Sequence, residues 1–298
     1  MLPFFVILSY YSIMISLDGK KLSQKILAEL KQEIADMAKK LRLAVVVIGQ
    51  NPVTQKFIQQ KQKAAQFIGV DFRIFPFEET VATDELRKRI AQIVHEKKNT
   101  GVIIQLPLPE HLNVQYILNS VTPEKDVDML SARSIGNLVA GKSEILPPVD
   151  GAIKAFFEEY GINYKSKYIT VIGAGKLVGL PVSLWLLNEK TTFSVLRSTT
   201  PNISEFTKKA DIIISGVGKP KLITGDMIKE GAVVIDAGTS ESEGPSTGLG
   251  TSKIVGDTDF ESCAEKASYI TPVPGGVGPV TVAILFRNLL TLAKAQKK

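Results

Sequence analysis

The strongest constraint on the fold is a repeated alternation between short apolar runs and amphipathic stretches. Runs of strand length, rich in β-branched residues, predict strands at 43–48, 71–75, 101–105, 168–172, 192–196, 211–215 and 232–236. Apolar residues that recur three and four positions apart predict helices at 22–37, 54–67, 84–95, 177–187 and 280–294. Strands that alternate with helices in this way form parallel sheets, so we expect an α/β protein.

A proline-rich segment divides this alternation into two halves. The sequence LPPVDG at 146–151 cannot continue a regular element through its prolines, and Asp150 is a candidate N-cap for a helix that runs to about residue 160. The 298 residues also suit two domains. We expect residues 14–149 to form the first domain, joined by the last helix (280–298), and residues 150–279 to form the second.

Composition excludes several classes of protein. Hydrophobic residues make up 44% and charged residues 22% of the chain, as in soluble globular proteins. The single cysteine, Cys263, excludes a disulfide framework and a cysteine-based zinc site, and two histidines leave little for other metal sites, so we expect no metal. The net charge of +6 favours anionic partners. This charge is spread along the chain without a basic and aromatic stripe, so we expect no nucleic acid.

The first 17 residues carry no charge and most of them are apolar. This run is shorter than the about 20 residues of a transmembrane helix, and it contains three serines. A secretory signal needs a basic start, but no Lys or Arg precedes Lys20. We therefore expect translation to begin at Met14, residues 1–13 to be a non-native or disordered extension, and the protein to be cytoplasmic with no membrane partner.

A glycine-rich turn follows the first strand of the second domain. The strand at 168–172 runs directly into Gly173, Ala174 and Gly175, and a helix begins soon afterwards. Glycines permit a tight turn close to a pyrophosphate, and the helix N-terminus offers free N–H groups to it. A tight turn without a ligand is the alternative, but the strand before and the helix after favour nucleotide binding.

The residues after the next strand bear on which nucleotide binds. NAD sites usually carry an acidic residue there, whereas this strand is followed by Arg197, Ser198 and Thr199. An arginine suits a 2′-phosphate, because it donates paired charge-assisted hydrogen bonds. We therefore expect NADP as the cofactor. NAD is the alternative if Arg197 is only a solvated loop residue.

Four other segments contain residues that could take part in binding or catalysis. Phe57 and Lys61 lie four apart on a predicted helix and share a face. Gln105 ends a buried strand, where a polar side chain needs a partner, and Asp128 follows a strand–helix unit. The segment ITPVPGGVGPVT at 270–281 forms a rigid backbone corner before the last helix. On spacing alone, a solvated basic helix face and a structural turn explain these segments at least as well.

Taken together, these segments resemble one family, the methylenetetrahydrofolate dehydrogenase/methenyltetrahydrofolate cyclohydrolases of folate one-carbon metabolism. The motifs QLPLP, PEKDVD, VGKP, GAVVIDAG, VGD and ITPVPGGVGP match it in order and spacing. The resemblance runs from LDGK at 17–20 to the last helix. It implies two α/β domains with a cleft between them, the second a Rossmann-type NAD(P)-binding domain through which the chain forms a homodimer.

The resemblance also implies an activity and a set of site residues. Members oxidise 5,10-methylenetetrahydrofolate with NADP and hydrolyse the methenyl product to 10-formyltetrahydrofolate. The catalytic lysine matches Lys61, the glutamine that orients it matches Gln105, and the aspartate that holds the pterin matches Asp128. The folate site matches Thr54, Phe57, Pro274, Gly275 and Gly276. The cofactor site matches Gly173, Ala174, Gly175, Ser198 and Thr239, with Arg197 as a substitute cation.

The chain departs from the family pattern near both ligands. Phe57 stands where the family has tyrosine, and Val149 where it has threonine, so two hydroxyls are lost at the cleft. Ala174 and Gly175 replace an arginine and a serine of the phosphate loop, and Thr239 replaces an isoleucine. A dehydrogenase with weak or no cyclohydrolase activity is therefore an alternative. Another two-domain oxidoreductase of shikimate-dehydrogenase type, and a non-enzymatic nucleotide-binding protein, are further alternatives.

Overall fold

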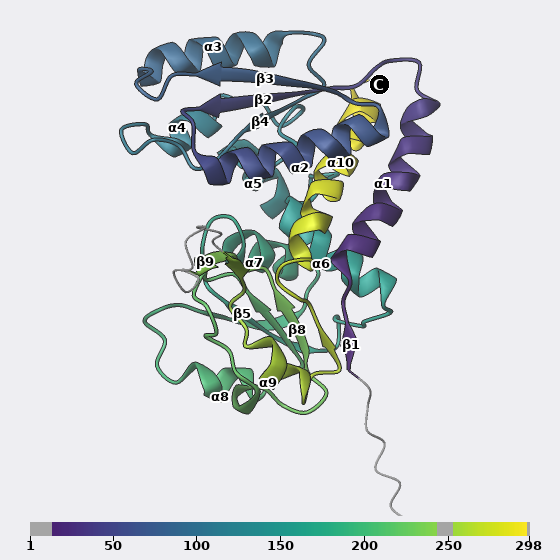
Figure 1. The fold of residues 1–298 in the computed structure, drawn as a ribbon, viewed down its shortest axis with the longest axis vertical. Coiled ribbons are helices and arrows are strands. Elements are labelled where there is room, and N and C mark those ends of the chain that lie inside the picture. The colour runs from purple at the N-terminus through teal and green to yellow at the C-terminus, as the bar shows by residue number, and fades with distance from the viewer. Residues whose placement is uncertain (1–13, 243–252, 297–298) are drawn as a thin grey trace, which may run out of the picture.

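The computed structural model describes residues 14–242 and 253–296; the expectation about residues 1–13 lies outside them. Two parallel sheets form two α/β layers, one above the other in Figure 1. The smaller sheet has the strand order β3-β2-β4 and the larger β1-β11-β8-β7-β5-β6. Every pairing within these two sheets is parallel, so the predicted fold class is confirmed.

The smaller sheet forms the centre of the first half. Its middle strand, β2, is buried along nearly its whole length because helices cover both faces. The elements of this half are β2 (Arg42–Ile48), β3 (Asp71–Phe77), β4 (Gly101–Ile104), α1 (Gly19–Ala35), α2 (Pro52–Ile68), α3 (Thr83–His95), α4 (Val114–Leu118) and α5 (Ala132–Val139). The predicted strands and helices are confirmed with shifts of a few residues at their ends. The short helices α4 and α5 were not predicted.

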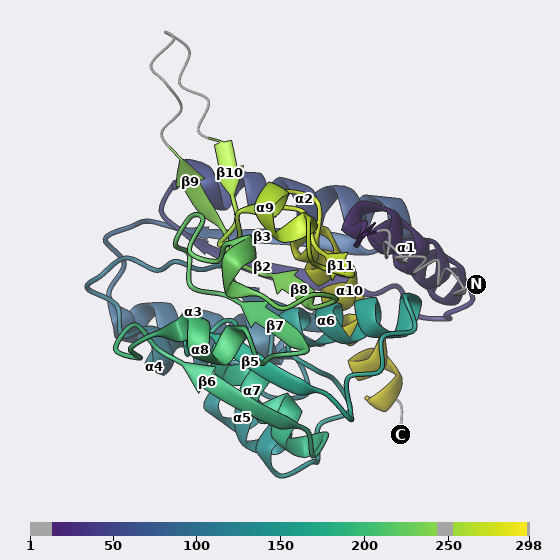
Figure 2. The ribbon, with the colours of Figure 1, turned by 90° about the horizontal axis from the view of Figure 1, so that it is seen from below.

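The larger sheet forms the second half. Its elements are β5 (Tyr168–Ile172), α7 (Gly179–Asn188), β6 (Thr192–Leu196), α8 (Ile203–Thr207), β7 (Ile212–Ser215), the 3-10 turn η1 (Gly225–Met227), β8 (Val233–Asp236), α9 (Phe260–Ala264) and β11 (Tyr269–Ile270). A hairpin of β9 (Ser240–Ser242) and β10 (Lys253–Val255) projects beyond the sheet (Figure 2). The segment ahead of α1 also joins this sheet, because β1 (Ile15–Ser16) pairs with β11.

Two helices connect the halves. The first, α6 (Pro148–Glu159), begins at Pro148, so the prediction of Asp150 as its N-cap is wrong. Proline suits the first helical position because it has no N–H to leave unpaired, and Asp150 lies in the first turn of the helix, fully buried. The second is α10 (Val277–Ala295). It is long and apolar enough to cross a membrane, but it packs against α1, α2 and α6 as a core helix.

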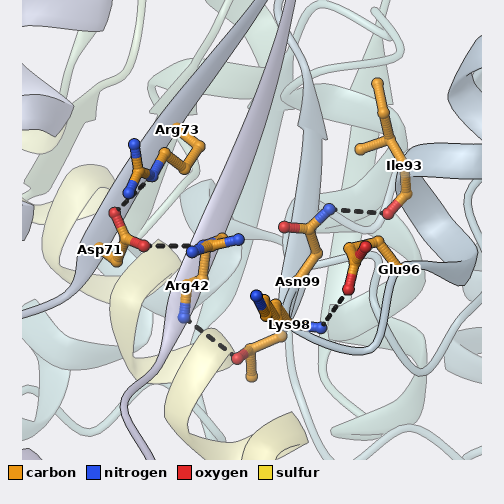
Figure 3. Close-up of polar contacts among 8 residues, drawn as sticks. Arg42, Asp71, Arg73, Ile93, Glu96, Lys98 and Asn99 are labelled. Carbon is orange, nitrogen blue, oxygen red and sulfur yellow. Dashed lines mark hydrogen bonds and ion pairs between the residues drawn. The ribbon is translucent and has the colours of Figure 1, made fainter.

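Polar contacts close the amino ends of the smaller sheet (Figure 3). Asp71 accepts hydrogen bonds from the Nε atoms of Arg42, at 2.7 Å, and Arg73, at 2.9 Å. Burial raises the pKa of Asp71, whereas the guanidinium groups of Arg42 and Arg73 lower it. Their combined effect is larger than that of burial, so the pKa lies below its ordinary value. The side chain of Asn99 donates to the Ile93 carbonyl nearby. In parallel α/β sheets, ligands usually bind at the carboxyl ends of the strands, which lie at the opposite edge of this sheet.

Candidate active site

Lys61 and Gln105 meet at the carboxyl end of the smaller sheet. Gln105 directly follows β4, and its backbone N–H continues the ladder to the Val46 carbonyl. Its side-chain Nε2 donates to the Leu106 carbonyl at 2.8 Å, which leaves Oε1 to accept from Lys61 Nζ at 2.8 Å. Lys61 comes from the middle of α2. The structure therefore brings together two residues that spacing alone left ambiguous.

Asp128 completes this cluster from a neighbouring turn. Asp126 anchors the turn, because its buried carboxylate accepts from Ser131 N and Ser134 Oγ, at 2.9 and 2.7 Å. Burial raises the pKa of Asp128, the Lys61 ammonium lowers it, and Asp126 raises it again, for a net rise. Burial lowers the pKa of Lys61 although Asp128 opposes this. A lysine whose pKa is lowered releases its proton more readily than a free lysine, which favours a role as a general base.

A cavity of about 1010 Å³ lies between the two halves, next to this cluster. It is large enough for a drug-sized ligand. Phe57, one helical turn before Lys61, is part of its wall, and so are the loop after β8 and the corner that precedes α10. The predicted folate-site residues Phe57, Pro274, Gly275 and Gly276 therefore meet here, and Thr239, predicted for the cofactor, joins them.

The predicted residue Thr54 lies two turns before Lys61 on α2. Its side chain is buried, and its hydroxyl has no hydrogen-bond partner within 14–242 and 253–296. A buried hydroxyl without a partner is costly unless a ligand or water supplies one. Thr54 does not appear in the lining of the cavity, so its place in the folate site stays a prediction.

The corner before α10 touches the start of α1. A Cβ atom added at Gly19 would overlap the carbonyl oxygen of Gly276, and the side chain of Lys20 lies over Gly275. Gly275 itself has a φ of 111°, which favours glycine. Two segments from opposite ends of the chain thus need glycine to form one wall of the cavity.

Gly19→Ala is expected to lower the free energy of unfolding by about 1–3 kcal/mol, because α1 and the Gly276 loop must separate. Urea unfolding monitored by circular dichroism measures this change. Gly136→Ala is the matched control, since a Cβ there meets nothing within 4 Å and lies in helix α5. Equal midpoints for Gly19→Ala and the wild type would show that the close approach is not required.

The phosphate loop lies in the second half. Gly173 has a φ of 94°, and its N–H donates to the Leu196 carbonyl at 2.9 Å. A Cβ at Gly179 would overlap the carbonyl oxygen of Gly173, so α7 begins directly against the loop. No side chain of the described residues caps this helix start at Val178. Its uncapped N–H groups therefore fit a nucleotide phosphate.

The other predicted cofactor residues lie around this loop. Arg197 and Ser198 follow Leu196 directly and are exposed, so they stand beside Gly173 at the same sheet edge. Ala174 and Gly175 complete the loop, and Gly175 accepts from Leu180 N at 3.0 Å. These residues do not appear in the lining of the central cavity, and neither do Lys61, Gln105 and Asp128. The structure thus groups the predicted residues into a lysine cluster, a cavity and a phosphate loop.

Sequence reasoning missed several residues of the cavity wall. Lys20, Lys63 and Gln60 line it, together with Leu177 and Val178 from the turn before α7. The three-and-four spacing of Phe57, Gln60 and Ala64 was a usable signal for one helix face. Lys20 gave no such signal, because its position depends on contacts between the two ends of the chain.

The glycine-rich turn of the second half and the lysine cluster of the first half flank one cavity between the halves, an arrangement typical of two-domain, dinucleotide-dependent enzymes. Two family models match the chain: the catalytic domain of the tetrahydrofolate dehydrogenase/cyclohydrolases over residues 17–128, and their NAD(P)-binding domain over 147–297. The chain belongs to this family. Its resemblance to the family, expected from the motifs, is therefore confirmed.

Curated relatives and solved structures agree. The "Bifunctional protein FolD" of Nautilia profundicola is 41% identical over 281 residues, which cover 93% of this chain and 96% of that protein. The Campylobacter jejuni bifunctional enzyme FolD superposes with a TM-score of 0.89 at 38% identity, covering 95% and 99% of the two chains. The Trypanosoma brucei FolD, complexed with NADP cofactor and inhibitor, has a TM-score of 0.90 at 33% identity, with 96% and 99% covered.

Proposed function

We propose that this protein oxidises 5,10-methylenetetrahydrofolate with NADP and hydrolyses the product to 10-formyltetrahydrofolate. The single observation that carries the proposal is the 2.8 Å contact between Lys61 Nζ and Gln105 Oε1 beside the central cavity. Family membership and the NADP complex of the Trypanosoma brucei relative support it. We further propose that the enzyme is soluble and cytoplasmic.

In the oxidation, this chain binds and orients the substrate. Asp128 accepts the paired N–H donors of the pterin edge, as a carboxylate can. Phe57 packs against the next ring from the cavity wall. Bound in the second half, NADP supplies the acceptor for the hydride that leaves the methylene carbon. Because a hydride takes both bonding electrons, Lys61 need not move a proton in this step.

In the hydrolysis, Lys61 moves the protons. Water adds to the cationic methenyl carbon, and the neutral Nζ of Lys61 accepts the proton that the water loses. The bond between this carbon and N5 then breaks, the ammonium of Lys61 returns the proton to N5, and the hydroxyl proton leaves to solvent as the formyl group forms. Gln105 holds Nζ in place through both transfers.

Turnover with purified enzyme tests this proposal. Methylenetetrahydrofolate is mixed with NADP or with NAD, and the nicotinamide and methenyl absorbances are followed together. We expect NADPH to form while the methenyl compound does not accumulate. Arg197, exposed beside the phosphate loop, supports NADP over NAD. Absence of reduced cofactor with both nucleotides would overturn the proposal.

Phe57→Tyr is expected to raise the hydrolysis rate by up to about tenfold, because a hydroxyl one turn from Lys61 adds a hydrogen bond to the proton-transfer site. Phe57 is 38% exposed, so the added group fits without repacking the core. The NADPH-forming rate of the same variant is the internal control and should change little. Stopped-flow measurement of methenyl decay checks the result. An unchanged decay would show that the missing hydroxyl does not limit hydrolysis.

We also propose that two copies associate through the second half. Leu180 and Leu187, two turns apart on α7, are 42% and 61% exposed, and Val195 is exposed on β6. In the described residues β6 pairs only with β5, so its outer edge is free. An apolar helix face beside an open sheet edge is typical of an interface between copies.

Leu187→Asp is expected to convert this dimer into a monomer, because each charge would be buried at the interface without a partner. Sedimentation velocity measures the change in mass. Val114→Asp is a matched control, since Val114 is an exposed apolar residue of the first half. A wild-type protein that sediments as a monomer would contradict the dimer.

A further inference from the structure

Three loops of the second half meet beside the carboxyl edge of the larger sheet. They are the segments 216–221 after β7, 237–239 after β8 and 256–259 after β10, and we name them the β7, β8 and β10 loops. Strands β8, β7 and β5 are neighbours in this sheet (Figure 2). Two buried carboxyl groups, those of Asp236 and Asp257, connect the three loops.

Asp257 joins the β10 loop to the β7 loop. Its Oδ2 accepts hydrogen bonds from Ser215 Oγ and Val217 N, both at 2.7 Å. Its Oδ1 accepts from Lys219 N at 2.8 Å. Hydrogen bonds to a carboxylate are stronger than those between neutral groups, and two of these three come from the backbone. One side chain of the β10 loop therefore fixes the backbone of the β7 loop.

Asp236 joins the β8 loop to the β10 loop in a similar manner. It accepts from Gly238 N at 2.9 Å, and from Thr258 N and Oγ1 at 2.8 and 2.7 Å. A Cβ atom added at Gly238 would overlap the carboxyl group of Asp257. A Cβ atom added at Gly256 would overlap that of Asp236. The three loops are therefore packed together as one unit around the two carboxyl groups.

The β7 loop borders the crevice in which such sheets bind a dinucleotide. The chain runs from β5 to β6 on one side and then to β7 on the other, so β5 and β7 flank the switch point of the sheet. Ligands of open parallel sheets bind in the crevice at that point. The Gly216 carbonyl oxygen lies 2.8 Å from the place of a Cβ at Gly173, so the β7 loop touches the phosphate loop. Gly216 also packs on Val178, which lines the central cavity.

We infer that Asp257 is a positioning residue for NADP, because it holds the β7 loop against the phosphate loop. The inference rests on the proposed function, in which NADP binds in the second half. Asp257 is 0% exposed, so it acts through Val217 N and Lys219 N and does not touch the cofactor. Asp236 lines the central cavity as well, so Asp257 is the better residue to replace.

Asp257→Asn tests the inference in the full-length enzyme. An amide has one acceptor oxygen where a carboxylate has two, so a backbone N–H of the β7 loop loses its partner. We expect the Kd for NADP, measured by calorimetric titration, to rise about tenfold, as for the loss of a buried hydrogen bond to a charged group. The KM for NADP should rise with it. The KM for methylenetetrahydrofolate and kcat should stay near those of the wild type.

Asp259→Asn is the matched control. It makes the same chemical change within the β10 loop, where Asp259 pairs with the exposed Lys221 at 2.9 Å. Exposed pairs contribute little, so the Kd for NADP should stay at the wild-type value. Ser215→Ala is a milder second variant, because it removes the hydroxyl donor and leaves both backbone donors of Asp257 paired. It should raise the Kd for NADP by about threefold, and it decides the question alone if Asp257→Asn does not fold.

The outcomes separate this inference from the proposed function. Thermal unfolding of each variant is measured beside NADP binding. A wild-type Kd for NADP in the folded variants, whatever their Tm, would show that Asp257 only stabilises the fold and would overturn the inference, while turnover by the wild type still upholds the proposed function. Weaker NADP binding by the variants, with a wild-type enzyme that binds NADP but does not oxidise methylenetetrahydrofolate, would uphold the inference and overturn the proposed reaction.

Discussion

Replacement of Lys61 by methionine is expected to lower the cyclohydrolase rate by about 10²–10⁴-fold, the range of general acid–base catalysis. Methionine is unbranched like lysine and only one atom shorter, but it cannot accept a proton from water. Oxidation of the methylene carbon should lose much less, because no proton passes through Lys61 in hydride transfer. The variant should therefore accumulate the methenyl compound while it still forms NADPH. A coupled absorbance assay separates the two rates.

Lys56→Met is the matched control for this variant. Lys56 lies on the same helix, is exposed, and has no hydrogen bond or ion pair to any residue in the described ranges, so its loss should leave both rates near those of the wild type. Circular dichroism of both variants checks that the overall helix content is that of the wild type. If Lys61→Met hydrolyses the methenyl compound at the wild-type rate, Lys61 is not the group that moves the proton.

Sequence periodicity located the long elements because their burial is regular. The runs at 43–48 and 168–172 were predicted as strands, and the structure confirms both as largely buried strands of the two sheets. Helices α4 and α9, of five residues each, are too short for a three-and-four repeat to emerge. The pairing of β1 with β11 joins the two ends of the chain, and no local pattern encodes such a contact.

In the candidate site, too, local sequence patterns predicted some features and only the tertiary fold determines the others. Spacing placed Phe57 and Lys61 on one helix face but did not decide whether that face was solvated. Only the fold brings Gln105 Oε1 to 2.8 Å from Lys61 Nζ, and this hydrogen bond fixes the position of the amine. Lys20 lies beside Gly275 because Gly19 packs on the following loop residue, so its place in the cavity wall follows from tertiary packing.

Asp150, which was wrongly predicted to be an N-cap, is a buried carboxyl group. Both carboxylate oxygens lack a hydrogen-bond partner among the described residues, and the side chain is 0% exposed. Burial raises the pKa of Asp150 well above its ordinary value. Lys154, one turn along α6, lies 3.8 Å from Glu158, so it is engaged elsewhere. The folded protein therefore holds Asp150 protonated at pH values where the unfolded chain has already released the proton.

Asp150→Asn is expected to remove a pH dependence of stability. Between the unfolded pKa of about 4 and the raised folded pKa, the folded state binds one proton more, so stability falls as pH rises, by up to about 1.4 kcal/mol per pH unit. The amide cannot ionise, so the free energy of unfolding of the variant should rise relative to that of the wild type from pH 5 to pH 8. Calorimetric unfolding across this range measures the gain. Asp84→Asn, an exposed control on α3, should follow the wild-type curve. A difference between Asp150→Asn and the wild type that stays constant with pH would mean that Asp150 ionises alike in the folded and unfolded chains.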